Sequence, residues 1–197
     1  MKMTKGRLLR VLASCALLAW AGSARAQWEL DGARSALNFI SIKNNNVAET
    51  HGFAALLGYI GGDGKVQLTI NLDSVATLID IRNQRMREML FETATFPAAI
   101  ITGTIDPAVL DAVGEGGTVL TELPVTLSLH GKERSLTVPV AVVGEGEGRM
   151  QVFSQRPVIV NAADFKTGGD TLAPVGEFGF MAQIMAAREG MPFARGK

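Results

Sequence analysis

The sequence predicts an all-β fold in which about eight antiparallel strands close into a barrel, with one short helix inserted at about residues 80–91. Three observations predict this fold. Apolar residues recur at every second position in segments bounded by Gly, Asn, Asp or Pro, which is typical of strands. Several of these segments are apolar on both faces, as a curved sheet around an apolar interior requires. Glycines inside them suit strands that bend as a barrel closes, at positions 52, 58, 103 and 179.

The clearest strand signal is a long hairpin. Apolar and polar residues alternate over 122–129, a tight turn follows at 130–133, and the alternation resumes over 136–142. Residues 65–73 alternate in the same way. Further strands are expected near 35–43, 48–60, 99–106, 149–160 and 177–187. A barrel of about eight strands either fills with side chains or holds one small ligand, and periodicity alone leaves both interpretations open, along with a filled β-sandwich.

One segment departs from the strand period. From Asp80 to Phe91 the apolar residues have roughly helical spacing, Asp80 is a suitable N-cap, and Pro97 lies beyond the end. We therefore predict a short helix after the third strand. Its three arginines are expected to form a solvated face, and the alternative is that one of them reaches an anionic head group at a barrel mouth; they are Arg82, Arg85 and Arg87.

The first 26 residues have the features of an export signal. A basic start precedes an apolar run that is shorter than the roughly 20 residues of a membrane-spanning helix. Ala24-Arg25-Ala26 is the small-x-small pattern that a signal peptidase cleaves. We therefore predict a signal peptide over 1–26, cleavage before Gln27, and one domain over 27–197 that is secreted to a bacterial periplasm. A retained N-terminal anchor and lipidation at Cys15 are the alternatives.

The composition of the mature chain argues against two classes of function. Five of the 19 basic residues and none of the 19 acidic residues lie within 1–26, which leaves 14 basic residues and a formal charge of −5. Nucleic-acid binding depends mainly on Lys and Arg that neutralise phosphates, so we expect no nucleic-acid partner. Cys15 is the single cysteine, and its removal leaves no disulfide and no thiol chemistry.

No pattern typical of catalysis occurs in the sequence. His51 and His130 each stand apart from the spacing of metal-binding motifs. The glycine-rich segments 61–64 and 144–148 suit turns between strands rather than phosphate binding. His130 is interpreted as a polar residue of the hairpin turn, whereas His51 begins the second predicted strand and is the candidate for a polar contact with a ligand. We predict no enzymatic activity, no metal and no cofactor.

Four motifs in order carry a resemblance to a known family. They are Trp28-Glu29-Leu30-Asp31 with the strand through Phe39, the segment IDIRNQRMREMLFETATFP, the hairpin LPVTLSLHGKERSLTVPVAV, and Ala163-Asp164-Phe165 followed by the strand from Phe178. Together they resemble the YceI-like family of exported, lipocalin-like barrels. The resemblance implies an extended eight-stranded antiparallel barrel with a helix near one end. It also implies a lumen that holds a long hydrocarbon such as a polyisoprenoid quinone precursor or a fatty amide.

Two departures from the family pattern concern the polar end of such a ligand. Asn161 and Ala162 stand where family members often have an arginine, and the stretch Lys43–Asn46 replaces a histidine that many members carry. The ligand's head group is therefore left open, while the expected fold is unchanged.

The apolar strands and the resemblance together predict binding and sequestration, or transport, of a polyisoprenoid or other lipid-like molecule. Each buried CH₂ contributes roughly 0.8 kcal/mol, so a long tail needs few polar contacts. The candidate ligand-binding residues lie on the apolar faces of the predicted strands, together with His51. They are Phe39, His51, Phe53, Leu68, Ile70, Leu127, Val138, Val140, Phe180 and Ile184.

Three alternatives to a lipid-binding barrel stay open from the sequence. A filled barrel could serve as a partner or regulatory module in the cell envelope, and an enzyme could use His51 as a base. An outer-membrane barrel is the third, although its aromatic girdles would have to come from few residues, since the mature chain has one Trp, Trp28, and one Tyr, Tyr59. A homodimer and transient contact with a membrane are compatible with the sequence.

Overall fold

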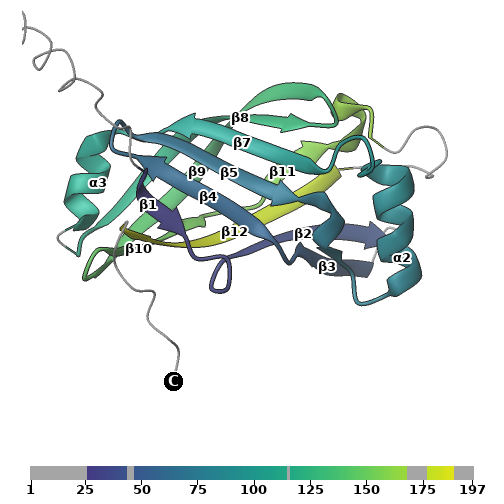
Figure 1. The fold of residues 1–197 in the computed structure, drawn as a ribbon, viewed down its shortest axis with the longest axis horizontal. Coiled ribbons are helices and arrows are strands. Elements are labelled where there is room, and N and C mark those ends of the chain that lie inside the picture. Colours follow the sequence, from purple (N-terminus) through teal and green to yellow (C-terminus); the bar gives the residue numbers. More distant parts are fainter. Residues whose placement is uncertain (1–25, 44–46, 115, 168–176, 189–197) are drawn as a thin grey trace, which may run out of the picture.

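The computed structural model describes residues 26–43, 47–114, 116–167 and 177–188 of the 197-residue chain. The predicted leader over 1–26, including Cys15, lies outside these residues apart from Ala26. The described part forms an elongated barrel of β-strands with a short helix near each end (Figure 1).

Eight antiparallel strands form a closed ring. In spatial order they are β1 (Ala26–Leu30), β4 (Leu56–Gly61), β5 (Lys65–Asn71), β7 (Ala98–Thr104), β8 (Thr118–Leu129), β9 (Lys132–Gly146), β10 (Arg149–Ser154) and β12 (Glu177–Arg188). The ring closes because β12 pairs back to β1, with Trp28 opposite Arg188. The predicted all-β barrel is confirmed.

Further strands lengthen the barrel wall at one end of the barrel, the end that the chain reaches after β5. They are β2 (Ala36–Lys43), β3 (Val47–Phe53), β6 (Val75–Ala76) and β11 (Val158–Asn161). The long strand β12 pairs with β1 and β10 toward its C-terminal end and with β2 and β11 toward its N-terminal end. Thus β1 and β2 follow each other along one edge of β12, and β10 and β11 follow each other along its other edge. Beyond them, β4 pairs with β1 and β3 pairs with β2.

These interruptions divide two segments that the sequence predicts as single strands. The run 48–60 breaks at Ala54 and Ala55, whose backbone N–H groups donate to the carbonyl and the hydroxyl of Ser74 rather than to a neighbouring strand. The run 149–160 breaks after Ser154, next to Pro157, which has no N–H for a sheet. The prediction of about eight strands in the barrel was correct, but the prediction that each of these two segments forms one continuous strand was wrong.

The predicted hairpin is confirmed as β8 and β9, which pair from Thr118 opposite Val143 to Leu129 opposite Lys132. Its two turn residues, His130 and Gly131, have φ angles of 50° and 68°. A two-residue hairpin turn of type I′ needs positive φ at both positions, and glycine adopts it without strain. The structure therefore places His130 in the turn, as the sequence indicates.

The predicted helix near 80–91 is confirmed, with two differences. It consists of α2 (Asp80–Arg85) and a π-helical turn, η2 (Met86–Leu90). The N-cap is Ile79, which makes no side-chain cap hydrogen bond, so the prediction of Asp80 as the cap was wrong by one residue. Asp80 instead lies in the first turn, where a carboxylate interacts favourably with the positive end of the helix dipole.

A second helix, α3 (Pro107–Gly114), closes the opposite end of the barrel and was not predicted. Proline suits the first position of a helix, and the Asp106 side chain accepts a hydrogen bond of 2.9 Å from the backbone N–H of Ala108. Leu110 and Val113 are buried among the core residues at this end. No helix of the described residues is long and apolar enough to cross a membrane.

Candidate ligand-binding site

Two adjoining apolar cavities occupy the barrel interior. The α2-side cavity has a volume of about 100 Å³ and the α3-side cavity about 140 Å³. Four residues line both cavities, so the two spaces are neighbours; we call them together the lumen, and the boundary that the four residues form between them the waist. The shared residues are Ile101, Val125, Val138 and Ala182.

The lining of the lumen is almost wholly apolar. Of the described residues that line the α2-side cavity, Ser154 alone is polar, and its hydroxyl accepts a hydrogen bond of 3.0 Å from the backbone N–H of Ala182. The α3-side cavity adds Trp28, Tyr59 and Gln67. Among the described residues, no charged side chain lines either cavity. An ionised group is costly to bury without a partner, so this lining suits neutral, apolar molecules.

Eight of the ten residues proposed from the sequence line the lumen. The α2-side cavity is lined by Phe53, Ile70, Leu127, Val138 and Phe180, and the α3-side cavity by Leu68, Val138, Val140 and Ile184. Phe39 and His51 line neither cavity.

Phe39 and His51 instead belong to an aromatic cluster next to the α2-side cavity. They lie opposite each other on β2 and β3, and their ring centroids are 5.2 Å apart. The Phe39 ring also contacts Phe53 and Phe180, at 5.4 and 5.9 Å. Both residues are nearly inaccessible to solvent, so they support the two phenylalanines that face the lumen.

The electrostatic surroundings of His51 favour its neutral form. Burial is the main cause that lowers the pKa of His51, the positive charge of Arg82 lowers it further, and the carboxylate of Glu49 partly opposes them. A neutral imidazole fits a site packed against aromatic rings, because a cation there would lose hydration.

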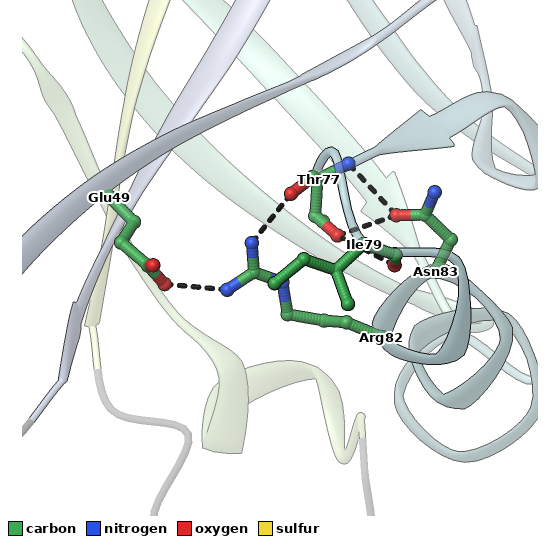
Figure 2. Close-up of polar contacts among 5 residues, drawn as sticks. All are labelled: Glu49, Thr77, Ile79, Arg82 and Asn83. Atoms are coloured by element: carbon green, nitrogen blue, oxygen red, sulfur yellow. Dashed lines mark hydrogen bonds and ion pairs between the residues drawn. The ribbon is translucent and has the colours of Figure 1, made fainter.

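A polar network fixes α2 beside this cluster (Figure 2). The Arg82 guanidinium lies 2.5 Å from the Glu49 carboxylate and donates a hydrogen bond of 2.6 Å to the Thr77 carbonyl. The Asn83 side-chain oxygen accepts hydrogen bonds from the Thr77 backbone N–H and hydroxyl, at 2.8 and 2.6 Å. Arg82 therefore departs from the prediction of a solvated face, whereas Arg85 is exposed as expected.

Several lumen residues were not predicted, although they have the same period-two spacing as the residues that were. Leu37 shares the inward face of β2 with Phe39, Val125 precedes Leu127 by two positions, and Ala182 lies between Phe180 and Ile184. The same period-two spacing would have identified these three residues from the sequence. Trp28 could be located only through the strand β1, which is too short to show a period.

Similar solved structures include barrels from three bacteria. A polyisoprenoid-binding domain from Saccharophagus degradans, implicated in plant cell wall breakdown, is 34% identical to this chain, with 83% of this chain and 99% of that domain covered and a TM-score of 0.78. BcnA from Burkholderia cenocepacia is 21% identical, with 79% and 98% covered and a TM-score of 0.64. A YceI protein from Campylobacter jejuni is 15% identical, with 76% and 90% covered and a TM-score of 0.56. The last two show likeness of fold alone.

No curated protein matches the chain at a comparable level of significance. The model of the YceI-like domain matches residues 28–185, which is nearly the whole of the described barrel. With this match and the 34% identity to the Saccharophagus domain over almost all of that domain, the chain belongs to the YceI-like domain family.

Proposed function

We propose that the protein binds and sequesters, or carries, a long apolar ligand of the polyisoprenoid or lipid type in the barrel lumen, after export to a bacterial periplasm. The observation that carries the proposal is the uncharged lumen, whose two cavities adjoin at Ile101, Val125, Val138 and Ala182. The related Saccharophagus domain is described as polyisoprenoid-binding, which supports this ligand class. The leader predicted from residues 1–26 supports export.

Binding by this lumen depends on apolar contact rather than on charge. A hydrocarbon chain gains roughly 0.8 kcal/mol for each CH₂ removed from water, and the wall of leucine, isoleucine, valine and phenylalanine side chains offers that environment. Among the residues that the structure describes, the lining holds no pair of titratable groups for acid–base chemistry, which supports sequestration rather than turnover.

The test is native mass spectrometry of the protein purified from its own periplasm, followed by solvent extraction of bound species. We expect a stoichiometric long-chain lipid. The variant Ala182→Leu places three additional carbons at the waist, and we expect it to lose this lipid while staying folded, because it fills existing space. The matched control is Gln183→Leu, which adds leucine at the next, exposed position of β12 and should retain the lipid.

Two results would contradict the proposed function. One is a bare protein mass together with no uptake of isoprenoid or fatty-acid ligands on titration, which would favour a filled-barrel partner module. The other is equal lipid content in the Ala182→Leu and Gln183→Leu variants, which would place the lipid outside the lumen.

A further inference from the structure

Trp28 carries a buried hydrogen-bond donor that no residue of the described chain satisfies. The side chain lines the α3-side cavity and is 1% exposed, and its Nε1–H has no acceptor among the described residues. Buried polar groups in folded proteins nearly always have a partner, and an indole can only donate. An orphaned donor beside an apolar cavity therefore calls for a partner that the described residues do not supply.

The surroundings of Trp28 hold its ring in place. It pairs with Ile60 of β4 on one side and with Arg188 of β12 on the other, and the Arg188 guanidinium carbon lies 5.4 Å from the centroid of the indole ring. Leu110 and Val113 of α3 belong to the same core cluster. The indole is thus enclosed by packing and cannot turn to solvent without disturbing this end of the barrel.

The other polar residues of the same cavity do not serve the indole. Gln67 offers a side-chain carbonyl, but that oxygen accepts from the Tyr59 hydroxyl at 3.5 Å. Tyr59 is 42% exposed and Gln67 points from the same face of the sheet, at the position opposite Tyr59 on β5. The donor of Trp28 and the acceptor of Gln67 therefore remain apart.

We propose that Trp28 Nε1 is the polar anchor of the lumen and selects ligands whose apolar chain carries a neutral hydrogen-bond acceptor, namely a ketone, quinone, ester or amide carbonyl. The inference rests on the function proposed above and adds the chemistry and the position of the ligand's polar end. A neutral acceptor is required because no described residue supplies a charged side chain to the lumen wall. The polar end then lies beside α3, at the opposite end of the barrel from His51.

The test compares farnesylacetone, an isoprenoid methyl ketone, with the hydrocarbon in which a methylene group replaces the ketone oxygen. Both are titrated against delipidated protein in three forms: the natural sequence, Trp28→Phe, and Phe153→Leu, which changes a 36% exposed aromatic residue that lines neither cavity. We expect Trp28→Phe to weaken ketone binding about fivefold relative to hydrocarbon binding, the change that one net hydrogen bond gives. Phe153→Leu should leave this ratio unchanged. Taking the ratio of the two ligands cancels their different solubilities and any loss of packing in the variant.

A second measurement is made on the natural sequence and uses the Trp28→Phe variant only to assign one resonance. In ¹⁵N-labelled protein of the natural sequence, the indole N–H resonance of Trp28 is identified by its loss in Trp28→Phe. We expect the ketone to move its proton signal downfield and the hydrocarbon not to do so.

The outcomes separate this inference from the function on which it rests. Suppose that both ligands bind the natural protein, that the affinity ratio is the same in Trp28→Phe, and that the ketone does not shift the indole N–H signal. The proposal that Trp28 anchors the ligand is then wrong, while lipid binding by the lumen stands. If neither ligand binds the natural protein, the proposed function itself fails.

Discussion

The carboxylate of Glu49 on β3 lies 2.5 Å from the guanidinium of Arg82 on α2, so one ion pair ties the helix to the barrel wall. The same guanidinium donates to the Thr77 carbonyl at the entrance to the helix. The segment that follows α2 covers this end of the lumen, because Leu90 is buried in the core and Phe91 lines the α2-side cavity. The position of Arg82 thus influences both the stability of the fold and the cover over the ligand.

We predict that Arg82→Met lowers the free energy of unfolding by about 1–2 kcal/mol. The ion pair itself contributes little, since both partners are about one-third exposed and solvent screens them. Most of the loss comes from the Thr77 carbonyl, which loses its donor in a partly buried site. Urea unfolding measures the change.

The control for Arg82 is Arg85→Met, which removes the same charge from an exposed position of α2. It should change stability by less than about 0.5 kcal/mol. The ligand should also dissociate faster from Arg82→Met than from Arg85→Met. Equal stability and equal dissociation rates in the two variants would mean that the network does not hold the helix.

The strand pattern was predictable where it is set locally. The alternation over 122–142 identifies β8 and β9, because a two-residue turn fixes their register without help from the rest of the chain. The break at Ala54 and Ala55 was not predictable, because it depends on hydrogen bonds to Ser74, far along the chain. Helix α3 was missed because eight residues with two buried side chains show too little periodicity.

The lumen was only partly predictable for a related reason. Period two indicates which residues of a strand face inward, and this placed Leu68, Ile70 and Ile184 correctly on the cavity wall. It cannot tell how far apart opposite walls lie, so it could not distinguish Phe39, which packs in the core beside the cavity, from Phe53, which lines the cavity. The unmatched donor of Trp28 depends on atoms from several strands and has no signature in sequence.

The pH dependence of stability should carry a contribution from His51. Its pKa in the folded state is lowered below the ordinary value of 6.5 by burial and by Arg82, against the opposing effect of Glu49. As the pH falls below about 6.5, the unfolded chain takes up a proton at this position, whereas the folded chain takes one up only at lower pH. The unfolded state then binds more protons, so the contribution of His51 to stability is fully present above about pH 6.5 and is lost as the pH falls.

The check is the urea midpoint measured between about pH 5 and pH 7, a window set by the pKa of His51 in the unfolded chain. His51→Gln should change the urea midpoint at every pH and should reduce the dependence of the midpoint on pH in this window. His130→Asn, which keeps a residue that tolerates positive φ in the hairpin turn, should leave the His51 contribution in place. An unchanged slope in His51→Gln would show that His51 is not held neutral in the folded protein.

The closure of the other barrel end depends on Gly144 of β9, which lies directly against the backbone of Val113 in α3. A Cβ added at this glycine would collide with the Val113 carbonyl oxygen, and backbone cannot move aside as a flexible side chain can. We predict that Gly144→Ala displaces α3 and lowers the free energy of unfolding by about 1–3 kcal/mol. Because Val113 packs beside Trp28 in the same cluster, the variant should also weaken ligand binding at the α3-side cavity.

Gly114→Ala is the matched control, since this glycine ends α3 and has open space where a Cβ would stand. Alanine is a better helix former than glycine by up to about 1 kcal/mol, so this variant should be neutral or slightly more stable. Thermal and urea unfolding of both variants, with titration of the same isoprenoid ketone, provide the comparison. If Gly144→Ala kept the stability and affinity of Gly114→Ala, then α3 would not seal the lumen, because the barrel would tolerate its displacement without loss.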